Sequence, residues 1–173
     1  MTLIHCTRKL LKELDVPLVE SDKIIQPTEG LGNWYCNIIR IDKKKCLLFT
    51  NEKTLYTFLI PKVKKENLKN IEDEFTIYLN YNLQCEGFGI EVISRVMLEY
   101  QEIGFAKTSN RQVLGSMNEF AFEYDYFIRR AGGLERAMIF EINKKINRTI
   151  MGALKYKYPI EALKSLLETM CNT

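Results

Sequence analysis

The sequence predicts an α+β fold, in which one compact domain, residues 1–173, contains a small mixed or antiparallel sheet covered by about five helices. Three observations support this prediction. The chain has 173 residues, a length typical of one domain, and neither an internal repeat nor a long linker divides it. Two β-rich runs flank a polar turn, as in a β-hairpin. Strands and helices alternate only imperfectly, which favours a mixed arrangement over a doubly wound sheet.

The chain is expected to start with a strand, a helix and a long loop. Residues 3–6 form a short β-rich run, and Thr7 can cap a helix that continues to Leu14. Residues 17–32 contain two prolines and two glycines among mixed polar residues, so we expect a loop there. Long loops often carry function, which makes this segment a candidate lid or binding loop.

A hairpin is the next predicted feature. Its strands are the β-rich runs 34–41 and 46–50. Thr50 or Asn51 is then expected to cap a short helix that ends near Pro61, because proline is a common stop signal. The sequence therefore predicts a change from strand to helix directly after the hairpin.

Apolar residues at helical spacing dominate the centre of the chain. They predict one helix over residues 66–85, ended by glycines, and another over residues 93–100. Residues 102–107 return to a strand-like composition. We therefore expect this last run to rejoin the sheet.

The best-defined helix follows that strand. Ser109 and Gln112 have the spacing of a capping box, and an apolar stripe continues to Ala131, just before a glycine pair. Residues 137–142 alternate like a strand but also fit a helix, so both interpretations stay open. Pro159 suits the first turn of a last helix.

The cysteine and histidine content bears on metal binding and on the compartment. The five cysteines form no C-x-x-C pair, and the single histidine, His5, has no partner at zinc-site spacing. We therefore expect no metal and no cofactor. An odd number of cysteines without an export signal favours a reducing compartment. No stretch approaches the roughly 20 apolar residues of a membrane span, so the predicted location is the cytoplasm.

Positive charge is only slightly in excess. Twenty-five Lys and Arg residues against 22 Asp and Glu residues give a net charge of +3, which by itself does not indicate nucleic-acid binding. Much of the excess is local, and the sequence leaves open whether folding gathers it on one face. The lysine-rich runs are 43–45, 62–65, 144–145 and 155–157.

Three stretches carry distinctive motifs. They are Cys6-Thr7-Arg8-Lys9-Leu10-Leu11, the segment from Trp34 to Phe49-Thr50-Asn51, and Asn110-Arg111-Gln112-Val113-Leu114-Gly115-Ser116-Met117-Asn118. Together they resemble a family of small prokaryotic proteins known only as a domain of unknown function. The resemblance implies an intracellular prokaryotic protein and supplies no catalytic residues.

The densest group of polar residues lies at the start of the helix predicted after residue 108. A helix N-terminus presents unpaired N–H groups and a partial positive charge, so it can receive an anion or a phosphate. Asn110 lies at this end, Arg111 can add a bidentate grip, and Ser116 and Asn118 can add hydrogen bonds. These four residues are the main candidate binding residues. In the purely structural alternative, Ser109 caps the helix and Asn118 faces solvent.

Two further groups are candidates. Arg8 follows His5 and Cys6 at the first strand–helix junction, but neighbouring side chains on a strand point to opposite faces, which argues against a catalytic pair. Lys155 and Lys157 alternate with two tyrosines, and in an extended segment the tyrosines would share one face. Aromatic rings beside positive charge can stack on single-stranded nucleic acid. Core tyrosines with solvated lysines explain the same pattern.

The lack of a recognised catalytic, metal or cofactor motif favours a non-catalytic binding or regulatory module of a prokaryotic cell, with a protein or nucleic-acid partner. The alternative is a small enzyme acting on a phosphate-bearing substrate, in which Arg111, Ser116 and Asn118 converge near residues 108–118. A third hypothesis is a structural subunit that associates with its own copies. The sequence does not decide whether the protein is an enzyme.

Overall fold

The centre of the molecule is a five-stranded mixed sheet with the strand order β4-β3-β2-β1-β5. The structure, a computed structural model, describes residues 1–20, 23–24 and 27–171. β2, β3 and β4 are antiparallel neighbours, whereas β1 lies between β2 and β5 and is parallel to both. The α+β fold predicted from the sequence, with its mixed sheet and hairpin, is confirmed. The strands are β1 Thr2–Cys6, β2 Trp34–Ile41, β3 Lys44–Asn51, β4 Thr57–Ile60 and β5 Ile103–Lys107.

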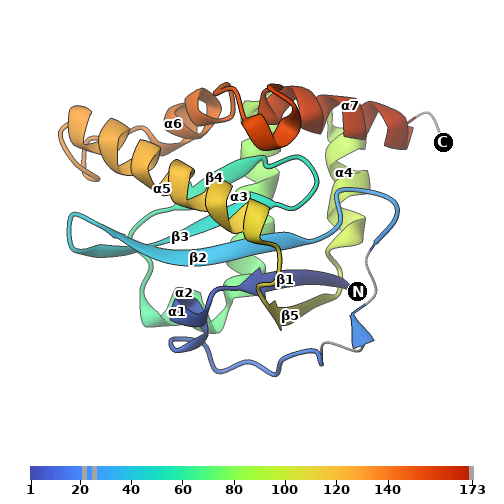
Figure 1. Cartoon of the computed structure of the whole chain (residues 1–173), viewed down its shortest axis with the longest axis horizontal. Helices are drawn as coiled ribbons and strands as arrows, with labels where there is room; N and C mark the ends of the chain where they lie inside the picture. The colour runs from blue at the N-terminus through green and yellow to red at the C-terminus, as the bar shows by residue number, and fades with distance from the viewer. Residues whose placement is uncertain (21–22, 25–26, 172–173) are drawn as a thin grey trace.

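Helices pack against both faces of this sheet (Figure 1). The described residues form seven α-helices and one short 3-10 helix, more than the about five helices that the sequence predicts. α3, α4 and α7 contribute to one core, and α5 and α6 contribute to the other. The helices are α1 Arg8–Leu11, α2 Lys65–Lys69, α3 Ile71–Cys85, α4 Ile90–Glu99, α5 Arg111–Arg130, α6 Ile139–Ile146 and α7 Pro159–Cys171, with the 3-10 helix η2 at Gly152–Leu154.

β2 shows why the sheet needs cover on both sides. Successive side chains of a strand point to opposite faces. Trp34 and Cys36 therefore enter the core under α3, α4 and α7, while Tyr35 and Ile41 enter the core under α5 and α6. All four side chains are buried, and burying one large apolar side chain contributes roughly 1.5–3 kcal/mol.

The β2–β3 hairpin closes with a tight turn. Asp42 and Lys43 have φ angles of 49° and 60°, the left-handed pair that a two-residue type I′ turn requires. The Asp42 carboxylate also accepts a hydrogen bond from the backbone N–H of Leu134, at 2.7 Å. The hairpin tip is thereby tied to the loop between α5 and α6.

The prediction of a short helix between the hairpin and Pro61 is wrong. β3 continues to Asn51, whose side-chain oxygen accepts hydrogen bonds from the backbone N–H groups of Lys53 and Thr54, at 3.1 and 3.0 Å. This arrangement closes a turn rather than a helix. Residues 57–60 then form β4, because every one of these four side chains is buried between β3 and the covering helices. Tertiary packing decides the conformation here, not the nearby proline.

Other predicted boundaries shift. α1 ends at Leu11 instead of Leu14, and the stripe over 66–85 is divided into α2 and α3 at Asn70. The predicted capping box is also wrong, because Asn110 and not Ser109 caps α5. The ambiguous residues 137–142 lead into a helix, α6. α4, β5, α5 and α7 lie where the sequence predicts them.

Two buried asparagines of α6 seal the outer edge of β4. Asn147 accepts a hydrogen bond from the N–H of Thr57 at 2.8 Å and donates one to the carbonyl of Thr57 at 2.7 Å. Asn143 accepts from the N–H of Leu59 at 3.1 Å and from the Tyr124 hydroxyl at 2.6 Å. An exposed strand edge invites unwanted pairing. Here side-chain amides take the place of a sixth strand.

The helices of the described residues are too short or too polar to cross a membrane.

Candidate functional site

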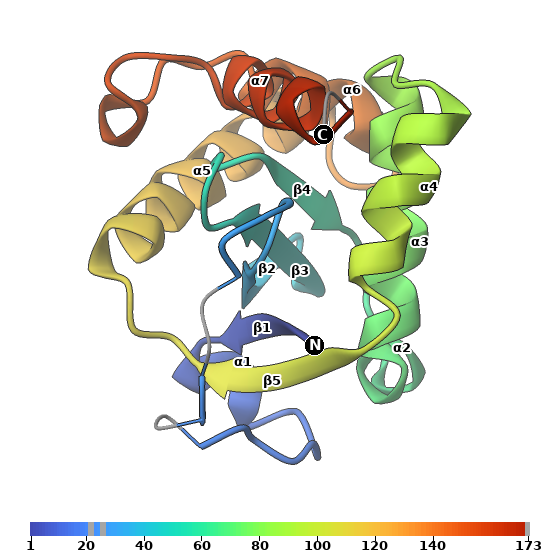
Figure 2. The same cartoon turned by 90° about the vertical axis from the view of Figure 1, so that its right-hand side faces the viewer.

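The chain leaves the ends of β1 and β5 in opposite directions. Cys6 and Lys107, the last residues of these neighbouring parallel strands, are paired in register. After β1 the chain enters α1, whose Leu10 belongs to the core under α3 and α4. After β5 it enters α5, whose Val113 belongs to the other core. Figure 2 shows α1 below the two strand ends and α5 starting above them. In open sheets, ligands bind at such a divergence. We call this place, the ends of β1 and β5 with the starts of α1 and α5, the crevice.

Basic residues predominate around this crevice, although Glu13 and Glu119 directly follow its two segments. Segments 7–12 and 107–118 contain five Lys and Arg residues and no Asp or Glu. Arg8, Lys107 and Arg111 are exposed, and none of the three forms an ion pair within the described residues. The structure therefore brings the predicted candidates Arg8 and Arg111 to the same end of the sheet.

Asn110 fixes the start of α5 beside the crevice. Its side-chain oxygen accepts hydrogen bonds from the N–H groups of Gln112 and Val113, at 3.0 and 3.3 Å. Its own backbone N–H donates to the Tyr35 hydroxyl at 3.1 Å. α5 is 20 residues long, so its first turn carries the full positive end of a helix dipole. Asn110 therefore orients this end and is not itself free to bind a ligand through its side-chain oxygen.

His5 lies directly behind the segment that joins β5 to α5. Its Nδ1 lies 2.9 Å from the carbonyl oxygen of Lys107, and its ring stacks on Tyr35 with centroids 4.8 Å apart. The residue is 1% exposed, and its Nε2 is the buried side-chain polar atom of the described residues that has no hydrogen-bond partner. Such atoms are rare in folded proteins and call for an explanation.

Ser116 and Asn118 do not join this group. Ser116 is buried, and its hydroxyl donates to the carbonyl of Gln112 at 3.1 Å. Asn118 is exposed on the side of α5 opposite to Ser116, on the same face as Arg111 but two turns further along the helix. The convergence of Arg111, Ser116 and Asn118 expected for a small enzyme is therefore not formed. Helical spacing explains this, because positions two and five residues apart lie far apart around a helix.

Lys155 and Lys157 belong to a turn rather than to an extended segment. Lys155 and Tyr156 have φ angles of 54° and 64°, and Met151 pairs with Lys157 as an isolated bridge. Tyr156 is 80% exposed, whereas Tyr158 packs against the core. The expected sharing of one face by the two tyrosines is therefore wrong, because left-handed residues reverse the chain between them.

The lysine-rich runs do not all gather at the crevice. At the hairpin tip Lys45 pairs with Glu13 at 2.7 Å, and nearby Lys62 pairs with Glu135 at 3.0 Å. Figure 1 shows the hairpin tip at the far left, away from the turn that holds Lys155. Acidic partners thus offset part of the charge at the tip, in contrast to the crevice.

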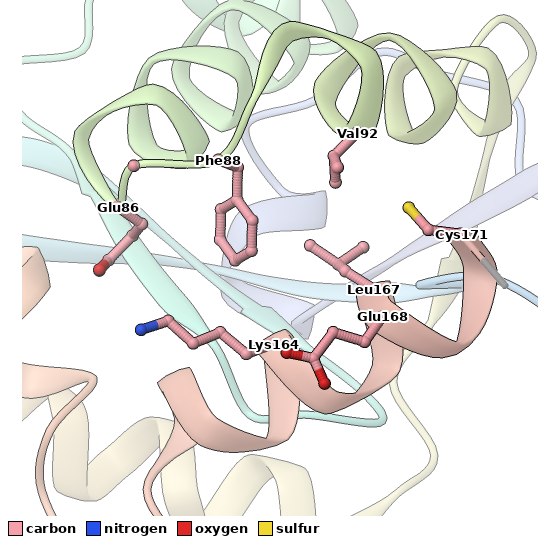
Figure 3. Close-up of a pocket in the computed structure, with 8 residues that line it drawn as sticks. Glu86, Phe88, Val92, Lys164, Leu167, Glu168 and Cys171 are labelled. Carbon is pink, nitrogen blue, oxygen red and sulfur yellow. The ribbon is translucent and has the colours of Figure 1, made fainter.

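A groove between α7 and the α3–α4 turn has a volume of about 460 Å³. Phe88, Val92 and Leu167 form its apolar floor, and Cys171 lies at one end (Figure 3). At the other end, the Glu86 carboxylate accepts two hydrogen bonds from Arg148, at 2.7 and 3.2 Å. The Glu86 carboxylate is thus already paired, and no residue of the crevice lines the groove.

The end of the predicted 17–32 loop is anchored. Glu99 accepts hydrogen bonds from the N–H groups of Leu31 and Gly32, both at 3.2 Å, and burial raises the pKa of this carboxyl. A side chain at Gly30, where φ is +67°, would collide with the same carboxylate. Positions 21–22 and 25–26 of the candidate lid lie outside the described residues.

The outer faces of α3 and α4 expose an apolar surface. Ile77 and Tyr81 on α3 are 50% and 54% exposed, and Ile90 on α4 is 80% exposed. A shallow groove between the helices joins them. A self-associating subunit would use such a surface. Self-association stays a prediction.

The three buried cysteines, Cys6, Cys36 and Cys46, are poor candidates for nucleophilic catalysis. Burial raises the pKa of the Cys6 thiol to about 12, and it also raises the pKa values of Cys36 and Cys46. A thiol acts as a nucleophile only as its thiolate. Residues 1–20, 23–24 and 27–171 contain no group of three His, Cys, Asp or Glu side chains that could hold a metal ion.

A family model described as a domain of unknown function, DUF6933, matches residues 3–162. The chain belongs to this family. No curated protein matches it. Within this DUF6933 domain, the three stretches that carry the resemblance adjoin one another. The Thr7 hydroxyl donates to the Asn37 side chain at 2.7 Å, and Tyr35 in the same strand holds the N–H of Asn110.

The sequence gives no direct sign that Lys107, Tyr35 and His5 lie together at the crevice of this DUF6933 domain. The sequence predicts only that Lys107 ends a strand, that Tyr35 is a core residue and that His5 is a surface histidine. They come together only because β1 pairs with β2 on one side and, about 100 positions away in the sequence, with β5 on the other. The periodicity of His5-Cys6 does place the two side chains on opposite faces, as predicted, but it does not show that both faces are buried.

Proposed function

We propose that this DUF6933 domain is a non-catalytic binding module whose partner is a nucleic acid, held by its phosphates at the crevice between the ends of β1 and β5. The observation that carries the proposal is the divergence of α1 and α5 from neighbouring parallel strands. It puts Arg8, Lys107 and Arg111 around one crevice, and none of the three forms an ion pair within the described residues. The setting we propose is the cytoplasm of a prokaryotic cell, which the family resemblance implies.

Two features make phosphate the best-suited ligand group. Guanidinium groups bind phosphate oxygens through paired N–H donors, and the first turn of α5 adds the positive end of its dipole. Buried His5, whose Nδ1 lies 2.9 Å from the Lys107 carbonyl oxygen, supports the β5–α5 segment from behind, and its unpartnered Nε2 does not reach the surface. A protein partner would more often be held by an apolar centre, whereas the exposed side chains of segments 7–12 and 107–118 are all polar.

The test is binding of labelled single-stranded RNA and DNA, measured by fluorescence anisotropy at about 50 and 200 mM salt. We expect micromolar affinity that falls steeply with salt, because phosphate contacts release counterions. Arg8→Ala and Arg111→Ala should each weaken binding by about three- to tenfold and lower the log–log salt slope by about one.

Lys164→Ala is the matched control, because it removes one exposed positive charge at the distant α7 groove. It should leave the affinity near that of the wild type. Equal losses of affinity in Lys164→Ala and Arg111→Ala would mean that the nucleic acid responds to the overall positive charge of the protein and has no defined site at the crevice. Absence of binding at low salt would retire the nucleic-acid proposal and favour a protein partner.

A further inference from the structure

The outermost line of α5 runs from the crevice to the far end of the helix. Six positions separated by 4, 3, 4, 4 and 3 residues lie on one line, opposite the buried stripe of this helix. At 1.5 Å per residue the line is about 27 Å long. Its members are Arg111, Gly115, Asn118, Phe122, Tyr126 and Arg129.

Two aromatic rings occupy the solvent side of this line. Phe122 is 80% exposed and Tyr126 is 53% exposed. A helix that packs by one face normally has polar side chains on the other. Neither ring contributes to either core, so packing of the domain does not account for them.

The surroundings of the rings suit a charged, planar ligand. The Arg130 guanidinium lies 5.8 Å from the centroid of Tyr126 and donates to its hydroxyl at 2.9 Å. Among the described residues, Phe122 makes no contact with another ring or with a cation, so no such group covers the faces of its ring. A side chain built at Gly115 would meet nothing within 4 Å, so a strand can approach the helix backbone there.

A second exposed tyrosine lies next to α5. The turn that holds Lys155, Tyr156 and Lys157 lies above the N-terminal half of α5 in both views (Figures 1 and 2). The Thr149 hydroxyl, just before this turn, donates to Glu123 of α5 at 3.2 Å. Tyr156 is 80% exposed, and both lysines are exposed.

We infer that the outer line of α5 is a stacking platform for single-stranded nucleic acid, with bases on Phe122 and Tyr126 and phosphates on Arg111 and Arg130. This inference rests on the proposed function, since the strand would continue from the crevice along the helix. Charge complementarity supports this occupant: a guanidinium lies at each end of the platform, and the carboxylate of Asp125 is paired with Arg129 at 2.7 Å.

Single strands should be preferred over duplexes. Aromatic side chains gain affinity by stacking on the flat faces of unpaired bases, whatever their sequence. In a duplex these faces are already stacked on their neighbours. Glu119, exposed beside the platform, would repel phosphates, so Glu119→Gln should tighten binding.

The experiment compares a labelled single strand of about 12 nucleotides with the same sequence as a duplex, for variants on two helices. Phe122→Ala and Tyr126→Ala should each weaken single-strand binding about tenfold and leave duplex binding little changed. Tyr81→Ala on α3 is the matched control, because Tyr81 and Tyr126 have nearly equal exposure, 54% and 53%. It should bind like the wild type.

The outcomes separate this inference from the proposed function. If Arg111→Ala weakens binding but Phe122→Ala and Tyr126→Ala do not, the platform is wrong and the phosphate crevice stands. If Tyr81→Ala loses as much as Tyr126→Ala, the effect belongs to aromatic residues in general and the platform also fails. If no oligonucleotide binds the wild type, both proposals fall. All of these side chains are exposed, so circular dichroism should show the same fold in each variant.

Discussion

Buried polar side chains at the two ends of the sheet differ in their hydrogen bonding. At the antiparallel edge, Asn143 and Asn147 satisfy the free backbone groups of β4, and their own amides are paired in turn. At the parallel end, the single histidine lies buried against Tyr35 with one ring nitrogen unpaired. The two asparagines and the histidine are all shielded from solvent, yet only the asparagine side chains have complete hydrogen bonding.

This difference separates a stabilising region from a binding region. A fully paired polar network in a low-dielectric interior holds elements in register. An unpaired buried atom costs free energy and persists where something else requires it. The charge at the parallel end agrees, because Arg8, Lys107 and Arg111 are exposed there and form no ion pair within the described residues. We therefore expect substitutions at the β4 edge to change stability, and substitutions at the β1–β5 end to change binding.

Asn147→Ala should have the largest effect on stability. It removes the amide that pairs with both backbone groups of Thr57 and leaves these buried groups unsatisfied. We expect the free energy of unfolding to fall by about 3–5 kcal/mol, measured by chemical denaturation.

Asn118→Ala, at an exposed position of α5, is the control for Asn147→Ala and should stay within about 0.5 kcal/mol of the wild type. A loss below about 1 kcal/mol for Asn147→Ala would show that solvent or a rearranged α6 replaces the amide. The β4 edge would then not be the stabilising region.

His5→Phe should have a much smaller effect on stability. Phenylalanine keeps the stack on Tyr35 and removes the unpaired nitrogen, while one hydrogen bond to Lys107 is lost. These changes largely offset each other, so we expect a difference within about 1 kcal/mol by the same denaturation assay. Binding of oligonucleotide should weaken.

A large loss of stability in His5→Phe, comparable with that of Asn147→Ala, would contradict the comparison, because His5 would then be a structural residue like the asparagines. Unchanged oligonucleotide affinity in His5→Phe would show that His5 does not contribute to binding, and the binding region would then depend on the arginines alone.

Elements with strong local signals could be predicted from the sequence. The hairpin, α5 and α7 have a polar turn, a long apolar stripe and an initial proline, and each of these acts through neighbouring residues. β4 could not be predicted, because residues 57–60 become a strand only by pairing with β3 beneath α6. Its burial depends on contacts with residues more than 80 positions away.

The site could be predicted only in part, for the same reason. Arg8, Asn110 and Arg111 stand at helix starts, which the sequence marks by capping residues. Their common location needs the parallel pairing of β1 and β5. Ser116 has a suitable side chain for a ligand, but helical geometry turns it into the core. The exposed Phe122 and Tyr126 fall within an apolar-rich helix, and their exposure shows only when α5 is packed on the sheet.

The most direct test of the central claim is hydrogen–deuterium exchange with and without a single-stranded oligonucleotide of about 12 nucleotides. We expect slower exchange in segments 6–11 and 107–115 on binding, and unchanged exchange in β4 and α6. Protection confined to α4 and α7, around the groove of Figure 3, would contradict the account and move the binding site to the other side of the molecule.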